Sequence, residues 1–281
     1  MTTIGLLHPG EMGASVGVSA RAGGSRVLWV SEGRGADTRR RAGAAGLEDA
    51  GTLRALLAAS DVVLAVCPPH AARDLARQVA GHGFRGVYID GNAIAPATAR
   101  EIDGIIRTAG ATYVDGGIIG PPPDQPGTTR LYLSGAGAER VRALFATGPL
   151  EAIVLTGDLT AASAIKMAYA AWTKGSQALI MAVRAMATAE GVDEALLAEW
   201  QRSQPELPRR SDNAARSTAR KAWRWVGEMD EIAATFAGAG LPDGFHRGAG
   251  EIYRRMASYK DAAVPPSMED VAKTLLRESG S

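Results

Sequence analysis

The chain has 281 residues, 46% of them hydrophobic and 22% charged, which is enough for one large domain or two ordinary ones. Its formal net charge of +1, with acidic and basic residues interspersed, argues against binding to nucleic acid or to an anionic membrane. The single cysteine, Cys67, excludes an intrachain disulfide. Neither a signal peptide nor a membrane-spanning run is apparent, so we expect a cytoplasmic protein. We also expect no metal site.

The first residues have the order strand, glycine-containing turn, helix. An apolar run from Thr3 precedes the turn, and residues 14–21 are compatible with a helix. Such a unit binds the phosphates of a dinucleotide, because a glycine lets the backbone approach the pyrophosphate and the helix N-terminus attracts the anion. The predicted cofactor-binding residues of this turn are His8, Pro9, Gly10, Glu11, Met12 and Gly13.

His8 occupies the place of the first glycine in the usual G-x-G-x-x-G pattern. Gly10 and Gly13 retain the two remaining positions: the close approach to the phosphates and the packing of the helix on its strand. Histidine is among the side chains enriched at positive φ. We therefore expect His8 to adopt the conformation that glycine has in this turn.

A second strand is expected at residues 26–30, and its end meets the adenosine ribose in a dinucleotide fold. Arg34, just beyond Ser31, suits a 2′-phosphate because its guanidinium binds oxyanions in a bidentate manner. Glu32 favours NAD instead. We expect these three residues to bind the cofactor and NADP(H) to be preferred over NAD(H). Arg39, Arg40 and Arg41 are interpreted as a solvated helix face.

Further strands are expected at residues 61–66, 86–90, 111–115 and 129–134, with helices at 96–110 and 139–146. Strands and helices that alternate at this spacing predict a mostly parallel, doubly wound Rossmann sheet, which we place at residues 1–156. Residues 116–123 are rich in glycine and proline and are expected to form a rigid loop.

Two more stretches follow the carboxyl ends of predicted strands, where ligands bind in open α/β sheets. The first is Cys67-Pro68-Pro69, whose prolines stiffen the loop, and the second contains Asn92, which offers an amide. We include all four residues in the predicted cofactor site. Cys67 is interpreted as a buried filler and not a nucleophile, and His70 is expected to begin the following helix.

Strand signals end near residue 156, and residues 157–281 are predicted to form an all-α domain. It begins with a long helix over about residues 158–190, which is apolar on nearly every side. This breadth predicts burial against a second copy, hence a homodimer through the helical domain. Shorter helices are expected at residues 194–203, 209–220, 222–239 and 243–258, and from Ser267, whose Ser-x-x-Asp pattern resembles a capping box.

The long helix carries a polar stripe: Ser163, Lys166, Thr173 and Gln177 share one face, with Tyr169 beside it. A lysine in the middle of such a helix either extends to water or lines a cleft. Because hydroxyl groups lie before and after it along the stripe, we favour the cleft.

Together, these motifs resemble those of the β-hydroxyacid dehydrogenases, the family of 3-hydroxyisobutyrate, tartronate-semialdehyde and 6-phosphogluconate dehydrogenases. The resemblance spans nearly the whole chain. Residues 4–13 resemble the family's cofactor turn, and Cys67-Pro68-Pro69 its second cofactor loop. Residues 115–120 lie where the family has its substrate loop, and Lys166-Met167 where it has a catalytic K-[LM]-x-x-N sequence. The helical half is most similar to a subgroup with a 6-phosphogluconate-dehydrogenase-like C-terminal domain.

The resemblance implies that Lys166 is the general acid in carbonyl reduction and the general base in alcohol oxidation. It also implies that substrate is bound by Ile118, Ile119, Gly120, Tyr169 and Thr173. The chain departs from the family at Ala170, which replaces asparagine, at Ile119, which replaces serine, and at Pro121, which replaces glycine and has no N–H to donate. A further departure is the acidic stretch around Glu228, which lies near the place where the family has a lysine in a later helix.

The expected function is hydride transfer between an NAD(P) nicotinamide and the carbonyl or alcohol carbon of a small, hydroxy-acid-like substrate. One alternative is an imine reductase on the same fold, which the acidic residues near Glu228 suit and Lys166 does not. The other is a non-catalytic NADP-binding scaffold protein, suggested by His8, Ala170 and Pro121.

Overall fold

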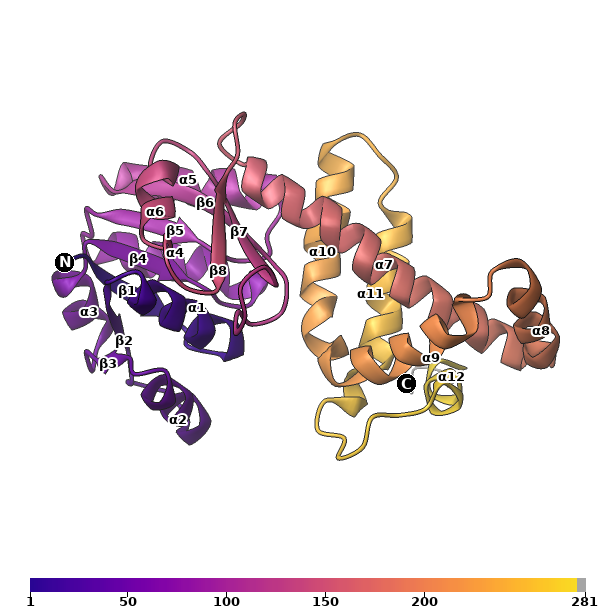
Figure 1. Ribbon diagram of the computed structural model, residues 1–281. Coiled ribbons are helices and arrows are strands. Elements are labelled where there is room, and N and C mark those ends of the chain that lie inside the picture. The colour runs from indigo at the N-terminus through magenta and orange to yellow at the C-terminus, as the bar shows by residue number, and fades with distance from the viewer. Residues whose placement is uncertain (277–281) are drawn as a thin grey trace. The chain divides into compact units, whose positions relative to one another are not determined.

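The structure, a computed structural model, describes residues 1–276 and divides into two compact units, Met1–Met167 and the chain from Ala168 onward. Within the described residues, the first unit contains an eight-stranded sheet of order β3-β2-β1-β4-β5-β6-β7-β8 (Figure 1). All neighbouring strands are parallel except β6 and β7. The strands are β1 (Thr3–Leu7), β2 (Arg26–Trp29), β3 (Glu48–Asp49), β4 (Val62–Ala65), β5 (Val87–Asp90), β6 (Thr112–Ile119), β7 (Thr129–Ser134) and β8 (Leu150–Val154).

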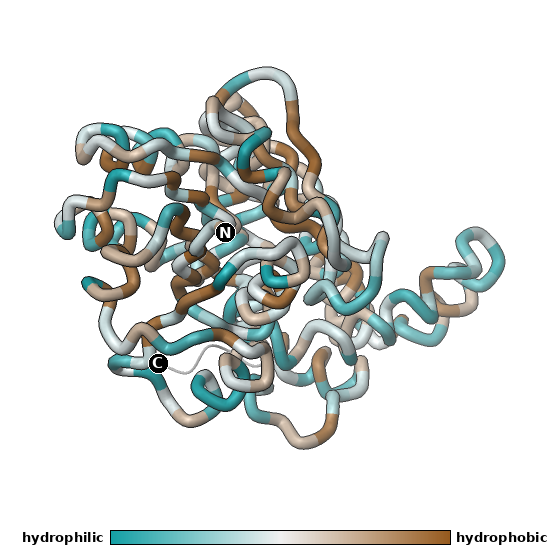
Figure 2. Tube along the Cα trace, turned by 60° about the vertical axis from the view of Figure 1, so that its left-hand side comes forward, coloured by the Kyte–Doolittle hydropathy of each residue, from teal (hydrophilic) through white to brown (hydrophobic). Residues whose placement is uncertain are grey.

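Helices cover both faces of this sheet, so the predicted doubly wound class is confirmed. They are α1 (Glu11–Ala22), α2 (Ala36–Ala44), α3 (Leu53–Ala59), α4 (Ala72–Gly81), α5 (Pro96–Thr108) and α6 (Ala138–Ala143). Apolar residues of α1, α2 and α6 pack in one core with Ile4 and Leu6 of β1. Residues of α3, α4 and α5 pack in a second core with Leu7. Because successive side chains of a strand point to opposite faces, the strands contribute hydrophobic side chains to both cores. Figure 2 shows the hydrophobic segments of the chain in brown.

Three parts of the sheet differ from the sequence prediction. The two-residue strand β3 was not predicted, and both of its residues are exposed, so no apolar run marks it. Residues 116–119, expected as part of a loop, continue β6, because β7 pairs with them antiparallel at Ile118–Leu131 and Ile119–Arg130. The strand β8 was not predicted. Of its residues only Leu150 is buried, so this edge strand lacks the apolar run that marks the inner strands.

The second unit contains helices. Its first element, α7 (Ala161–Ala189), begins within the first unit and was predicted within a few residues. The others are α8 (Asp193–Ser203), α9 (Leu207–Thr218), α10 (Ala222–Gly238), α11 (Gly244–Arg255) and α12 (Met268–Leu276). The predicted capping box of α12 is confirmed: the Asp270 N–H donates to Ser267 Oγ at 3.1 Å, and the Ser267 N–H to Asp270 Oδ2 at 3.0 Å.

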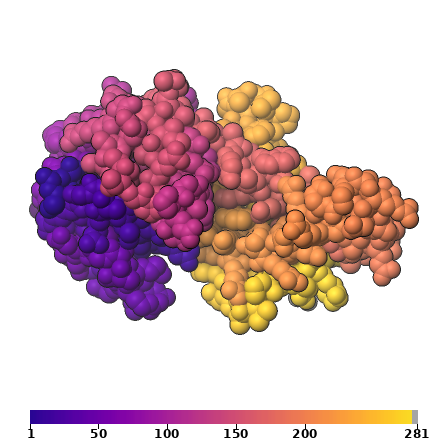
Figure 3. All heavy atoms as spheres, viewed as in Figure 1, coloured from indigo at the N-terminus to yellow at the C-terminus, as the bar shows by residue number. Residues whose placement is uncertain are grey.

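Polar contacts tie α7 to its neighbours inside this unit. Lys174 of α7 forms an ion pair with Glu228 of α10, and the Tyr253 hydroxyl of α11 donates to the Lys174 carbonyl oxygen at 2.6 Å. Arg184 donates to both carboxylate oxygens of Asp193, at 2.6 and 2.9 Å, and so holds α8 beside the end of α7 (Figure 3). Among the described residues, no helix combines the length and the hydrophobicity that crossing a membrane requires.

Candidate functional site

The turn between β1 and α1 has the backbone that a phosphate-binding turn requires. His8 has a φ of +68°, and among the described residues no other non-glycine residue has a positive φ. A Cβ on Gly13 would lie 2.5 Å from the His8 carbonyl oxygen, so only glycine lets α1 start this close to β1. A Cβ on Gly10 would meet nothing within 4 Å, and no side chain caps the helix that begins at Glu11. The backbone next to Gly10 and the first amides of α1 are therefore open to an anion.

His8 is uncharged at neutral pH. Burial, with a smaller contribution from the nearby Arg34 guanidinium, lowers the pKa of His8 from 6.5 to about 4. Arg34 also acts electrostatically on Cys67, so its guanidinium faces the carboxyl ends of β1 and β4. Burial lowers the pKa of Arg34, and within residues 1–276 it forms no ion pair. A partly desolvated, unpaired positive charge thus lies at this edge of the sheet.

The loop after β2 is held by an arginine that the sequence analysis assigned to a solvated face. Arg39 Nη2 donates to the Ser31 carbonyl oxygen at 2.9 Å, and Arg39 Nε to the Arg34 carbonyl oxygen at 3.2 Å. Arg40 fits the solvated interpretation, since its ion pair with Asp37 is exposed. Ser31 is buried, and its hydrogen bonding lowers the pKa of Asp49. Arg39 thus fixes the backbone from which Arg34 extends, whereas the neighbouring Glu32 is exposed.

The loops after β4 and β5 are joined by one side chain. The Cys67 N–H donates to Asn92 Oδ1 at 2.6 Å, and the Asn92 N–H donates to Asp90 Oδ1 at 3.0 Å. Asn92 is 2% exposed, and its Nδ2 has no hydrogen-bond acceptor within the described part of the chain. Burial, then the charge of Asp90, raises the pKa of Cys67 to about 12, so the thiol stays protonated and is a poor nucleophile.

Pro68 and Pro69 continue this edge. Pro69 is buried and begins a short 3₁₀ helix, Pro69–Ala71, that leads into α4. His70 lies inside that turn, as expected for a residue that starts a helix.

Lys166 reaches the extension of β6. Its Nζ donates to the Ile118 carbonyl oxygen at 2.8 Å. A Cβ on Gly117 would lie 2.4 Å from the Ala162 carbonyl oxygen and 3.0 Å from Lys166 Cβ, so glycine lets α7 lie directly against the strand. Ile118 Cδ1 in turn lies 3.5 Å from the Cβ position of Gly91, the residue before Asn92. The lysine therefore lies near the carboxyl end of β5, on the edge that carries Asn92.

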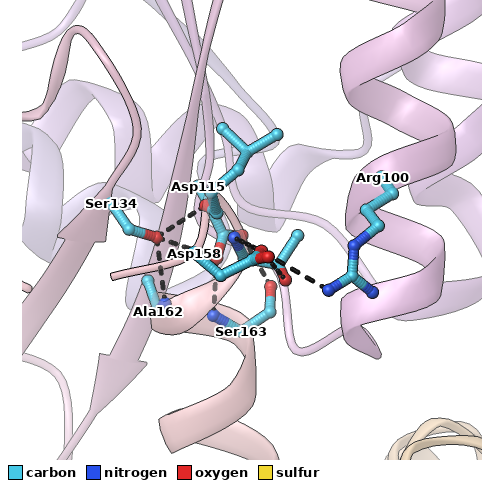
Figure 4. Close-up of polar contacts among 8 residues, drawn as sticks. Arg100, Asp115, Ser134, Asp158, Ala162 and Ser163 are labelled. Atoms are coloured by element: carbon cyan, nitrogen blue, oxygen red, sulfur yellow. Dashed lines mark hydrogen bonds and ion pairs between the residues drawn. The ribbon is translucent and has the colours of Figure 1, made fainter. Parts of the chain in front are cut away.

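The side chains of the polar stripe of α7 have different partners in the structure. Ser163 is fully buried, and its hydroxyl donates to Asp115 Oδ1 at 2.6 Å (Figure 4). Further along the helix, Gln177 Oε1 accepts a hydrogen bond from the Thr218 hydroxyl at 3.0 Å. Ser163 and Gln177 are therefore hydrogen-bonded within the protein. Lys166 is the residue of the stripe whose polar group lies at the edge of the sheet.

The residues predicted to bind substrate belong to both units of the structure. Ile118 and Ile119 are 6% and 3% exposed, so their side chains belong to the interior and only their backbone borders the edge. Gly120 has a φ of +130°, where β6 ends. Tyr169 and Thr173 belong to the second unit: Tyr169 is 47% exposed, and the Thr173 hydroxyl donates to the Tyr169 carbonyl oxygen at 2.9 Å.

Two comparisons of sequence match only part of the chain. A family model described as a domain of unknown function (DUF1932) matches residues 187–256. An uncharacterized 28.5 kDa protein of Methanothermus fervidus is 28% identical over 167 residues, 59% of this chain. The match spans less than two thirds of that relative, 63% of its length.

Solved structures match nearly the whole chain. The 3-hydroxyisobutyrate dehydrogenase of Mycobacterium tuberculosis, solved with L-serine, has a TM-score of 0.70 at 18% identity and covers 99% of this chain and 100% of its own. The chain has the fold of the 3-hydroxyisobutyrate dehydrogenases. A reductive aminase of Aspergillus terreus, solved with NADPH and ethyl levulinate, has a TM-score of 0.57 at 17% identity, covering 97% of this chain and 99% of its own. The resemblance seen in the sequence is thereby confirmed at the level of fold.

The two glycines of the turn allow a first test. In this dehydrogenase fold, Gly10→Ala adds a methyl group to open space at a φ of −69°, so we expect a melting temperature within about 2 °C of wild type. The same methyl group blocks the approach of a pyrophosphate, so the dissociation constant for NADPH should rise by at least about tenfold. Gly13→Ala should instead lower stability by about 1–3 kcal/mol, because its Cβ meets a backbone oxygen.

Thermal unfolding and fluorescence titration with NADPH measure both effects. Gly104→Ala in α5 is the matched control, since its Cβ also meets nothing within 4 Å but lies far along the chain from the turn. Unchanged NADPH binding by Gly10→Ala would show that the turn does not hold the cofactor phosphates.

Proposed function

We propose that this protein is an NAD(P)-dependent oxidoreductase that interconverts a carbonyl and an alcohol on a small, hydroxy-acid-like substrate, with Lys166 as general acid and base. The observation that carries the proposal is the placement of the Lys166 ammonium group, 2.8 Å from the Ile118 carbonyl oxygen beside the end of β5. It stands on the same edge of the sheet as the phosphate turn and Asn92. Structures of the same fold include dehydrogenases and reductases, which supports oxidoreductase chemistry.

The residues at this edge fit a dinucleotide. The open backbone at Gly10 and the uncapped start of α1 suit a pyrophosphate, and Arg34 supplies a positive charge without an acidic partner in the described chain. The buried Nδ2 of Asn92, which has no acceptor within residues 1–276, suits a ribose or nicotinamide oxygen. The loop Cys67-Pro68-Pro69 and the turn residues His8, Pro9, Glu11 and Met12 complete the binding surface. When bound, the nicotinamide supplies or accepts the hydride.

The protein's own part in the reaction is proton transfer. During reduction, the Lys166 ammonium group donates a proton to the substrate oxygen as negative charge develops there. During oxidation, the neutral amine accepts the hydroxyl proton. The hydrogen bond to the Ile118 carbonyl oxygen orients Nζ, and a lysine side chain would otherwise sample many rotamers. We include the backbone of Ile118, Ile119 and Gly120, together with Tyr169 and Thr173, as the substrate-binding set.

Replacement of Lys166 tests this role. We expect Lys166→Met to lower kcat by at least about 100-fold, which is the lower range for loss of a general acid, and to leave the dissociation constant for NADPH within about threefold. Steady-state kinetics and fluorescence titration measure the two quantities. The control is Lys273→Met, which removes an exposed lysine of α12. If kcat of Lys166→Met stayed within a few-fold of wild type, Lys166 would not be the general acid and base.

The substrate panel for these assays should contain 3-hydroxy acids, aldehydes and cyclic imines. Reductive aminases share the fold, and reduction of C=N bonds is the alternative reaction. A lysine at position 166 favours an oxygen substrate, because a cationic iminium is repelled by an ammonium group. Turnover of imines alone would support the alternative.

The preference for NADP(H) rests on Arg34. Arg34→Met should weaken NADPH binding by at least about tenfold and NADH binding much less, because the 2′-phosphate loses its charge-assisted hydrogen bonds. Calorimetric titration of both cofactors measures the difference, and Arg40→Met, which removes an exposed arginine of the same helix region, is the control. Tighter binding of NADH than NADPH by the wild-type protein would contradict the preference.

We also propose a homodimer formed through α7. Three large hydrophobic side chains on this helix are 50–69% exposed and recur at intervals of seven residues: Trp172, Leu179 and Met186. Such a heptad-like spacing suits packing against another helix. The second copy of α7 offers the same stripe, which a symmetric dimer can bury against itself.

Sedimentation velocity tests the dimer. We expect wild-type protein to sediment as a dimer and the double variant Trp172→Glu/Leu179→Glu as a monomer, because two buried charges per subunit are costly. Leu241→Glu, at an equally exposed leucine beyond α10, should leave the dimer intact. A monodisperse wild-type monomer would refute the proposal.

A further inference from the structure

We propose that Asp115 and Ser134 are positioning residues for Lys166: they bind the first turn of α7 to β6 and β7 and so set the location of the lysine. This inference rests on the function proposed above for Lys166. Neither residue contacts a substrate in the proposal, and both act through the backbone of α7.

The amide groups at the start of α7 are bound by these two side chains. The first N–H groups of a helix have no partner inside the helix, so side chains must supply acceptors when the end is buried. Here the Ala162 N–H donates to Ser134 Oγ at 3.0 Å, and the Ser163 N–H donates to Asp115 Oδ2 at 2.7 Å. The Ser163 hydroxyl adds a bond to Asp115 Oδ1 at 2.6 Å. Figure 4 shows these side chains converging on the first turn of the helix.

The two strands hold the acceptors rigidly. The Ser134 hydroxyl donates to the Leu159 carbonyl oxygen at 2.7 Å, and its oxygen lies 3.3 Å from Asp115 Oδ2. Asp115 and Ser134 are directly opposite in the antiparallel pair of β6 and β7. Tyr113, two residues earlier in β6, has its hydroxyl 3.4 Å from Asp115 Oδ1.

Capping a helix with a buried aspartate costs free energy, because the carboxyl group loses its contact with water. Its side chain is fully buried, and within residues 1–276 no basic side chain forms an ion pair with it. Burial raises the pKa of Asp115, while the hydrogen bonds from Ser163, Ser134 and Tyr113 oppose that rise. A buried carboxyl group held only by hydrogen bonds demands exact donor placement, since one lost donor leaves a buried oxygen without a partner. This network therefore tolerates little displacement of α7.

The network and the lysine form a closed ring of contacts. Ser163 precedes Lys166 by almost one helical turn, so both lie on the face of α7 turned toward β6. Asp115 precedes Ile118 in β6, and Ile118 accepts the hydrogen bond from Lys166 Nζ. The helix is thus joined to one strand at two points, with Gly117 between them in direct contact with α7. Movement of the first turn would displace Nζ from the edge of β5, where a small misplacement costs rate.

The variants Asp115→Asn and Ser134→Ala test the proposal. Asp115→Asn keeps the size of the side chain but removes its charge and one acceptor. We expect kcat to fall at least about tenfold in both, with the NADPH dissociation constant within about threefold, because the phosphate turn is not altered. The pH dependence of kcat should also change. The limb that disappears in Lys166→Met should move by at least about half a pH unit in Asp115→Asn, because the environment of Nζ changes.

The control is Arg100→Ala. Arg100 contacts Asp158 near the start of α7 at 3.4 Å, but both side chains are more than half exposed, so the pair contributes little. It should leave kcat and its pH profile unchanged. NADPH binding and the melting temperature establish that each variant is folded, and Ser134→Ala removes one hydroxyl only, should Asp115→Asn fail to fold.

Amide hydrogen exchange at Ala162 and Ser163 provides a reading independent of activity. If these amides exchange faster in the variants while kcat and its pH profile stay at wild-type values, the network is structural and the positioning role is refuted. A normal kcat in Lys166→Met refutes the function of Lys166 itself. A low kcat in Lys166→Met combined with normal kcat in both Asp115→Asn and Ser134→Ala refutes only the positioning.

Discussion

The start of α7 depends on a buried carboxylate that no cation neutralises within residues 1–276. Asp115 accepts hydrogen bonds from the backbone N–H and the hydroxyl group of Ser163, and their geometry allows little freedom because a carboxyl oxygen without a partner is costly to bury. In the proposed mechanism, the position of Lys166 depends on this attachment. The lysine side chain is long and flexible, so the position of its ammonium group depends on the position of the helix turn that carries it.

At the edge of the sheet that we propose binds the cofactor, burial leaves the Arg34 guanidinium without an acidic partner among residues 1–276. Desolvation keeps His8 neutral and the Cys67 thiol protonated, although both lie at the ends of strands where a ligand is expected. Arg34 remains charged, and Arg39 holds the backbone on which it stands. A guanidinium with no ion-pair partner in the described part of the chain, next to an open helix N-terminus, gives a positive potential suited to a phosphate group. The neutral His8 avoids a second positive charge that would repel Arg34.

Glycines connect these two regions by allowing backbone to approach backbone. Gly13 brings α1 against the His8 carbonyl oxygen, and Gly117 brings α7 against β6. In each case a Cβ would lie only 2.5 or 2.4 Å from a backbone oxygen, which is closer than van der Waals contact allows. The low aromatic content of the chain, 5%, fits an interior in which helices lie close to the sheet.

Local sequence patterns determined much of this protein by themselves. The apolar runs specified the inner strands, Gly10 and Gly13 specified the turn, and Ser267 with Asp270 specified the start of α12, because each pattern depends on neighbouring residues. Only the tertiary structure decided the partners of Ser163, Arg39 and Ile118. The spacing of Ser163 on α7 places it on the stripe with Lys166, but its hydroxyl group donates to Asp115, 48 residues away in the sequence. Residues 116–119 became a strand because β7 supplies the opposite ladder. Polar and glycine-rich segments have no preferred local structure strong enough to reveal such partners, so their conformation follows from distant hydrogen bonds.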